Sequence, residues 1–166
     1  MPPIPTDTIT PPNAVFEPAR HELLCLLERM TGTLEGSLDT PIEGLFLHRI
    51  SQPTGPKPAL QKAALAVIAQ GSKRVLNGDE AYEYDPFHYL ISSVDLPVVA
   101  KVSVASPTLP YLGLRLDLNP EEITALISDE NLPPLVPAEA SRAMCVNPLG
   151  GTLLDVMLRL LRLLDT

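Results

Sequence analysis

The sequence predicts a mainly β protein, a sandwich or barrel of short strands with one helix before the strands and further helices after them. Nineteen prolines are spread over 166 residues, and prolines at this density divide a chain into short pieces. An Asn-Gly pair, Asn77-Gly78, separates two strand-like segments and is a strong signal for a hairpin turn. Several more short apolar segments follow between turn residues, and that spacing is typical of sandwiches and barrels.

Size and charge exclude several classes of protein. At 166 residues and 18.0 kDa the chain favours one compact domain. Its net charge of −8 makes it a poor binder of nucleic acid by itself, because such binding depends on basic side chains. No apolar run is long enough to cross a bilayer, and the first residues lack a secretory signal. Two cysteines, Cys25 and Cys145, are too few for a disulfide framework and favour a cytoplasmic location.

The first 17 residues are expected to form a flexible arm, and residues 18–166 a single domain. Five prolines before residue 13 favour an extended polyproline conformation with little to bury it. The arm also carries Ile4, Val15 and Phe16. We therefore hypothesise that it closes over a pocket in the barrel, which hydrogen exchange with and without a ligand would test.

A helix follows the arm. Pro18 suits a first helical position, apolar residues recur at helical spacing from Leu23 to Met30, and Gly32 is a plausible end. The next residues, 33–44, are rich in turn signals. We expect a strand over residues 44–51 and a surface loop over the proline-rich residues 52–58.

The central region predicts the remaining strands. An apolar run over residues 64–70 precedes the hairpin, and turns at Pro86, Pro97 and Pro110 separate the segments after it. In the last segment, leucines alternate with other residues, which predicts a half-buried strand with a period of two. The expected strands after the first therefore cover residues 64–70, 73–76, 79–84, 88–94, 98–104 and 111–118.

Two helices and one more strand are expected near the C-terminus. Asn119, Pro120 and two glutamates are typical of a helix start. Residues 142–146 favour a final strand. The last helix, over residues 153–164, is predicted to begin with a capping box of Thr152 and Asp155.

The last helix is apolar around most of its circumference. Its polar residues Asp155, Arg159 and Arg162 form one narrow stripe, and the other positions are Leu, Val or Met. A surface helix needs an apolar face of only about 100°, so one side is expected to pack on the barrel and the other on another copy or a further domain. We favour a homodimer. The residues expected to form this contact are Leu153, Leu154, Met157, Leu160, Leu161 and Leu164.

The chain lacks motifs that would indicate an enzyme. A cupin-type metal site needs two histidines two residues apart, whereas the three histidines here are isolated. No serine lies in a Gly-x-Ser-x-Gly elbow, and no phosphate-binding loop is present. We therefore expect no catalytic residue, no metal site and no cofactor.

A ligand cavity inside the barrel is the remaining expectation. Alternate residues of a strand line the interior of a small barrel, and a few polar groups among aliphatic ones define a pocket. A small, mostly apolar ligand is favoured, since the chain has few aromatic residues to stack on a sugar. Packing tyrosines and a solvent-facing histidine are an equally good interpretation. The pocket candidates are Phe46, His48, Tyr82, Tyr84, His88 and Ser92.

An ordered series of short motifs, over about residues 18–166, resembles the N-terminal domain of AraC-type transcriptional regulators. The motifs are Gln70-Gly71-Ser72-Lys73-Arg74-Val75-Leu76, Tyr84-Asp85-Pro86, Ser93-Val94-Asp95-Leu96-Pro97, Pro110-Tyr111-Leu112 and Leu153-Leu154-Asp155-Val156.

The resemblance implies a cupin-like jelly-roll barrel, a double-stranded β-helix, that senses a small-molecule effector and dimerises through its C-terminal helices. It also implies a following DNA-binding domain with two helix-turn-helix motifs. That domain is absent from this sequence, so we expect the chain to be part of a longer protein. The resemblance carries over no ligand-binding residue. Two alternatives remain, a small cupin-fold metalloenzyme with an atypical metal site and a dimerisation module with a filled barrel.

Overall fold

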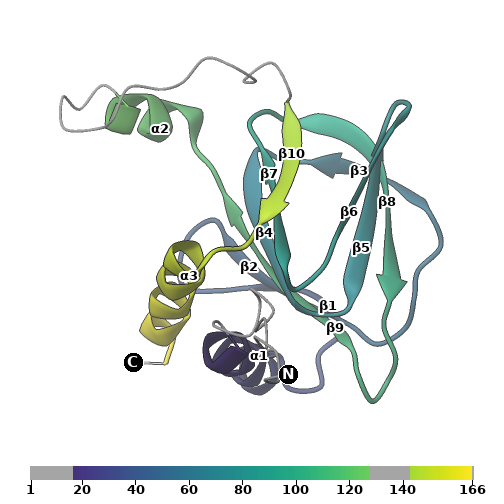
Figure 1. The fold of residues 1–166 in the computed structure, drawn as a ribbon, viewed down its shortest axis with the longest axis vertical. Coiled ribbons are helices and arrows are strands. Elements are labelled where there is room, and N and C mark those ends of the chain that lie inside the picture. Colours follow the sequence, from purple (N-terminus) through teal and green to yellow (C-terminus); the bar gives the residue numbers. More distant parts are fainter. Residues whose placement is uncertain (1–16, 128–142, 166) are drawn as a thin grey trace, which may run out of the picture.

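Two antiparallel β-sheets face each other, and two helices cover the outer side of the larger sheet (Figure 1). The computed structural model describes residues 17–127 and 143–165. The larger sheet has six strands in the order β1-β2-β9-β4-β7-β10, and the smaller has four in the order β3-β8-β5-β6. The predicted mainly β class with flanking helices, a cupin-like jelly roll, is therefore confirmed.

The elements follow one another along the chain with short connections. Their bounds are α1 (Glu17–Thr31), β1 (Gly36–Asp39), β2 (Leu45–Ile50), β3 (Lys57–Gln61), β4 (Ala64–Gln70), β5 (Ser72–Asn77), β6 (Glu80–Tyr84), β7 (His88–Ser92), β8 (Leu96–Val104), β9 (Tyr111–Asp117), α2 (Pro120–Ile127), β10 (Met144–Pro148) and α3 (Gly151–Leu163).

Most of the strands predicted from the sequence are confirmed, with ends shifted by a few residues. Two strands were not predicted, β1 within the turn-rich region and β3 at the end of the proline-rich loop. Both lie at the edge of a sheet. An edge strand needs only one hydrogen-bonded neighbour, so β3 can contain Pro58, which donates no backbone hydrogen bond. Its proline content therefore hid β3 from a reading of local sequence.

The predicted hairpin is confirmed, but its turn is centred one residue later than expected. Asn77 pairs with Glu80, so the two central residues are Gly78 and Asp79. Gly78 has a φ of +59°, whereas no described residue other than glycine has a positive φ. One glycine at the first central position is thus enough to reverse the chain.

The protein has two hydrophobic cores, one on each side of the larger sheet. The first lies between the sheet and the helices and contains Leu27, Leu114 and Leu161. The second lies between the two sheets and contains Ile68, Val75 and Leu90.

Strand β9 contributes to both cores, which corrects the prediction of a half-buried strand. Leu112 and Leu114 pack toward the helices, while Tyr111 packs between the sheets. By the alternation of a strand, Gly113 and Arg115 share the inner face with Tyr111. Residues that the sequence placed in solvent therefore face the interior.

The helix ends follow the predictions in part. At the start of α2, the backbone N–H of Glu121 donates to Asn119 Oδ1 over 2.9 Å, so the predicted cap is confirmed. The capping box predicted for α3 is wrong, because the helix begins one turn earlier. Gly150 is its N-cap and provides no side-chain hydrogen bond. Asp155 instead pairs with Arg159, with Oδ2 and Nε 3.0 Å apart.

The expected arm lies almost entirely outside the described residues, because only Glu17 of residues 1–17 is described and it opens α1. Within the described part of the chain, no helix is long and apolar enough to cross a membrane.

Candidate functional site

A cavity of about 130 Å³ opens between the two sheets. Its polar lining comes from four strands: His48 on β2, Lys73 on β5, Tyr84 on β6, and Tyr111 and Arg115 on β9. Much of the remaining lining is aliphatic and includes Ala66, Val98 and Ala100. The cavity thus combines an apolar body with a few convergent polar groups, as small-molecule sites commonly do.

Strand register brings these polar side chains to the same level of the barrel. His48 is paired with Gly113, and its neighbour Phe46 with Arg115. In the smaller sheet, Lys73 is paired directly with Tyr84. Because paired residues of adjacent strands point to the same side, these side chains all project between the sheets.

Two glycines make this arrangement possible. Gly71, with a φ of +88°, joins β4 to β5 where the chain passes from one sheet to the other, and a Cβ there would lie 2.5 Å from the carbonyl oxygen of Val104. A Cβ at Gly113 would lie 3.1 Å from the Tyr111 hydroxyl oxygen and 3.0 Å from the Val67 carbonyl oxygen. The absence of side chains therefore leaves room for the crossing and for the Tyr111 ring.

The charged groups at the cavity differ in how they are satisfied. Arg115 Nε donates to Asp117 Oδ1 over 2.8 Å, and the guanidinium carbon lies 4.4 Å from the centre of the Phe46 ring. Lys73 makes no hydrogen bond or ion pair with any described residue. Burial, and next the charge of Arg115, lower the pKa of Lys73.

His48 is held neutral beside these cations. Burial, followed by the charges of Lys73 and Arg115, lowers the pKa of His48 from 6.5 to about 4. A neutral imidazole offers one hydrogen-bond donor and one acceptor. It can therefore orient a ligand without adding charge.

Two buried tyrosines complete the polar lining. Tyr84 is 2% exposed and Tyr111 is 4% exposed, and their hydroxyl groups are hydrogen-bonded to each other. Burial raises the pKa of both hydroxyls above the usual value. Both remain protonated near neutral pH, so they can donate and accept hydrogen bonds.

All six predicted pocket residues lie on strand positions that share the inner face, but only two line this cavity, His48 and Tyr84. Phe46 lies under Arg115 and borders a separate hollow. The other three are engaged locally: the Tyr82 hydroxyl by Glu80, His88 Nδ1 by Asp85 Oδ1 at 2.8 Å, and Ser92 Oγ by the Val94 carbonyl at 2.7 Å.

The sequence analysis missed three residues of the cavity, Lys73, Tyr111 and Arg115. Lys73 occurs two positions before the apolar Val75, so strand alternation places both on one face. Tyr111, Gly113 and Arg115 were assigned to solvent because the alternating leucines were given the core. The length of strand buried on both sides by flanking layers would have been the relevant signal.

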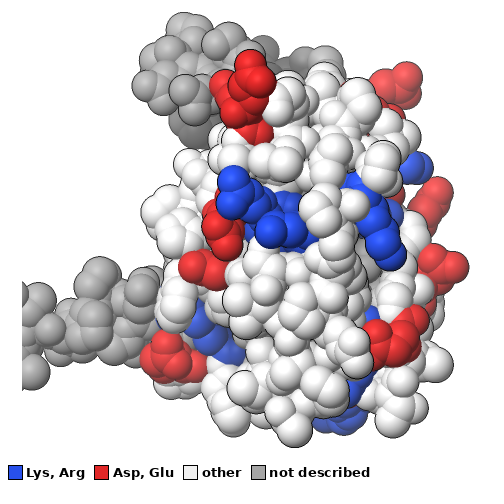
Figure 2. Space-filling view, turned by 90° about the vertical axis from the view of Figure 1, so that its right-hand side faces the viewer, with Lys and Arg blue, Asp and Glu red and all other residues white. Residues whose placement is uncertain are grey.

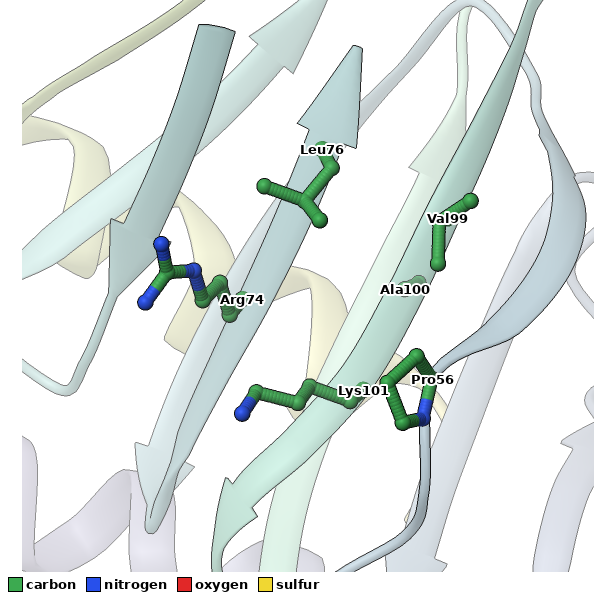
Figure 3. A pocket seen from close by; sticks show the side chains of 6 residues that line it. All are labelled: Pro56, Arg74, Leu76, Val99, Ala100 and Lys101. Atoms are coloured by element: carbon green, nitrogen blue, oxygen red, sulfur yellow. The ribbon is translucent and has the colours of Figure 1, made fainter. Parts of the chain in front are cut away.

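Two other hollows lie outside the barrel interior. One, of about 140 Å³, lies on the outer face of the smaller sheet, where the side chains of Arg74 and Lys101 extend beside Leu76 and Val99 (Figure 3). That face carries basic side chains near its middle and acidic ones around them (Figure 2). Across the strands, Arg74 is paired with Glu83. The local basic charge is therefore opposed, unlike that of Lys73.

The second hollow, of about 410 Å³, borders Phe46 and contains three carboxylates, those of Glu43, Asp117 and Glu122. Within residues 17–127 and 143–165, no three His, Cys, Asp or Glu side chains lie close enough together to hold a metal ion.

Helix α3 buries part of the surface expected to contact a second chain. Leu154, Met157 and Leu161 are at most 2% exposed within a single chain, so they cannot touch a partner without rearrangement. Of the remaining candidates, Leu153, Leu160 and Leu164 are partly buried against the same core.

The exposed apolar side of α3 lies one position away from the buried one. Val156 is 48% exposed and Leu163 is 61% exposed. Together with Leu153 and Leu160 they form a stripe spaced by three, four and three residues, which we call the α3 stripe. Two ion pairs hold α3 against α1, Arg162 with Glu22 at 2.7 Å and Arg29 with Asp165.

Comparisons with known proteins place this architecture among transcription regulators. The family model described as the N-terminus of AraC-type transcriptional regulators matches residues 41–166. A solved structure of apo ToxT from Vibrio cholerae is similar, with 7% sequence identity and a TM-score of 0.49, over 77% of this chain and 50% of that chain. The chain thus spans about half the length of ToxT. No curated protein sequence matches.

Proposed function

Because this chain belongs to the family of AraC-type transcriptional regulators, as an N-terminal domain, we propose that its barrel binds a small-molecule effector and relays that binding to a DNA-binding domain elsewhere in the protein. The observation that carries the proposal is the cavity between the sheets, with Lys73 facing it unpaired among the described residues. The proposal places the protein in the cytoplasm, the location expected from its two cysteines.

Strand β9 supplies a physical route from the cavity to the helices. Its inner residues Tyr111 and Arg115 line the cavity, and its outer residues Leu112 and Leu114 belong to the core that contains α1 and α3. A ligand that prefers one position of β9 would shift the helices that pack on it. Such a shift requires the ligand to bind one arrangement better than the other.

We also propose that two copies associate through the α3 stripe. Apolar residues spaced alternately by three and four form the seam of two-helix packing, in which each helix presents the same surface to the other. Leu153, Val156, Leu160 and Leu163 have this spacing and are all at least partly exposed. A second copy therefore matches the stripe better than an unrelated surface.

The proposed function includes no catalysis. The alternative of a cupin-fold metalloenzyme predicts stoichiometric iron, manganese or zinc in the purified protein, and metal analysis distinguishes the two. The alternative of a dimerisation module with a filled barrel predicts that no small molecule stabilises the protein.

A thermal-shift screen combined with light scattering tests the proposal. We expect at least one small molecule to raise the melting temperature and also to change the dimer dissociation constant, since linkage makes the two effects reciprocal. The variant Ala100→Leu, which fills the cavity, should lose the ligand's effect. Ala81→Leu on the exposed side of β6 is the matched control. Equal stabilisation of both variants would contradict a site between the sheets.

A further inference from the structure

Two positively charged groups face the cavity from opposite sheets, and no residue that lines it is acidic. Lys73 projects from β5 of the smaller sheet and Arg115 from β9 of the larger one. Asp117, the partner of Arg115, borders a different hollow. The cavity itself therefore carries uncompensated positive charge.

An unpaired lysine inside a protein is costly, because it has lost water and gained no counter-charge. Lys73 has this environment: Tyr84 is its cross-strand neighbour, and no described carboxylate reaches its Nζ within ion-pair distance. Replacing such a lysine with an apolar residue would stabilise the fold. An anion arriving in the cavity would instead supply the missing partner.

Arg115 is prepared for the same anion. Its described hydrogen bond engages Nε only, and the stack on Phe46 fixes the plane of the guanidinium group. A carboxylate is planar and accepts two parallel hydrogen bonds from such a group. The hydroxyls of Tyr84 and Tyr111 and the neutral imidazole of His48 offer further hydrogen bonds nearby.

The size and the apolar lining of the cavity favour an organic anion over an inorganic one. Its volume is about 130 Å³, and an apolar cavity of roughly 150 Å³ holds one benzene molecule. Ala59, Val98 and Ala100 offer no hydrogen bonds to the outer oxygens of a phosphate. One ring or a short aliphatic chain would instead bury its apolar surface against them.

We propose that the barrel cavity binds a small organic carboxylate, with Lys73 and Arg115 holding the carboxylate group and the alanine and valine side chains enclosing its apolar body. The inference rests on the proposed function only in naming the class of effector. Binding by itself can be measured whether or not the chain regulates transcription.

The test compares probes by calorimetry and thermal shift on the whole 166-residue chain. Sodium benzoate and sodium butyrate are expected to bind and to stabilise the protein. Benzyl alcohol and butanol have similar apolar bodies without the charge, and phosphate at equal ionic strength has the charge without the body. We expect all three controls to bind at least about tenfold more weakly, since a charge-assisted contact accounts for that ratio or more.

Variants locate the binding site. Lys73→Met should raise the melting temperature without ligand, because the uncompensated charge is removed, and should weaken carboxylate binding by about 10- to 100-fold. Because this variant is expected to be more stable, loss of binding will not reflect unfolding. Lys101→Met on the outer face of the same sheet is the matched control and should bind like the wild type.

Three outcomes would overturn the inference: no binding of either carboxylate, equal binding of the alcohols, or undiminished binding by Lys73→Met. If an uncharged compound binds in the cavity and changes dimerisation, the proposed function stands and the carboxylate inference fails. If carboxylates bind through Lys73 without altering dimerisation or DNA binding, the inference stands and the proposed regulation fails.

Discussion

At the scale of single residues, the barrel interior holds titratable groups that ordinary cores avoid. His48, Lys73 and Arg115 share one cavity, and burial together with mutual repulsion disfavours their charged forms. Protein interiors accept such groups where they serve a ligand or a neighbour rather than the stability of the fold. The pH dependence of stability therefore reports on the site.

His48 makes the protein less stable as the pH falls. Its pKa is about 4 in the folded protein, compared with 6.5 for the unperturbed group, so the unfolded chain takes up the proton first. Its contribution is complete above about pH 6.5 and is lost on acidification to about pH 4, a decrease of about 3 kcal/mol in the free energy of unfolding.

Urea unfolding at several pH values measures this loss. His48→Gln should flatten the curve between pH 6.5 and 4 relative to the wild type, whereas His21→Gln on the exposed side of α1 should leave it unchanged. Parallel curves for wild type and His48→Gln would show that the imidazole is not held neutral.

Gly71 is the residue at which a side chain is least tolerated. Gly71→Ala combines a left-handed φ of +88° with a 2.5 Å approach to the Val104 carbonyl oxygen, so we expect a loss of at least about 2 kcal/mol in the free energy of unfolding. Gly55→Ala, where a Cβ meets nothing within 4 Å, should change it little. Equal urea midpoints for the two variants would contradict the crossing geometry.

At the scale of elements, β9 and α3 each serve two surfaces. β9 separates the cavity from the helical core, so one strand carries both the polar lining and the apolar support. α3 divides its apolar residues between that core and the exposed α3 stripe. A change in ligand occupancy and a change in association can therefore be connected through a single layer of packing.

The two sides of α3 should respond differently to substitution. Leu161→Ala removes a fully buried side chain and is expected to lower the free energy of unfolding by about 2–5 kcal/mol. Val156→Glu in the α3 stripe should change stability by less than about 0.5 kcal/mol but shift a dimer to monomer. Chemical unfolding and light scattering measure the two effects. Val156→Glu with an unchanged mass would remove the α3 stripe from the dimer contact.

At the scale of the whole molecule, charge separates sensing from DNA contact. The net charge is −8, and the basic side chains on the outer face of the smaller sheet lie among acidic ones (Figure 2). Non-specific DNA affinity requires several basic side chains to displace counterions together. We therefore assign DNA binding to another domain.

Fluorescence anisotropy with a labelled duplex checks this assignment. The chain alone should show no binding at micromolar concentration in physiological salt. A further measurement at low salt serves as the control, because electrostatic binding would strengthen there. Affinity that rises steeply as salt is removed would show that this domain contacts DNA itself.

Local sequence determined the elements of this protein and the parity of its strands. Turn residues such as Gly78 and the alternating leucines of β9 act over a few neighbouring positions, so the hairpin, most strands and the first and last helices were predicted. Local pattern also placed His48 and Tyr84 on inward-facing positions. Edge strand β3 escaped because its only partner, β8, lies far along the chain.

Only the tertiary structure decided which inward positions meet. Lys73 and Arg115 lie 42 positions apart along the chain and belong to different sheets. They converge because the sheets pack face to face, and a single strand's pattern contains no information about the opposite layer. The same holds for α3: its pattern predicted a helix apolar on most sides, but packing against α1 and β9 decided which leucines a second copy could reach.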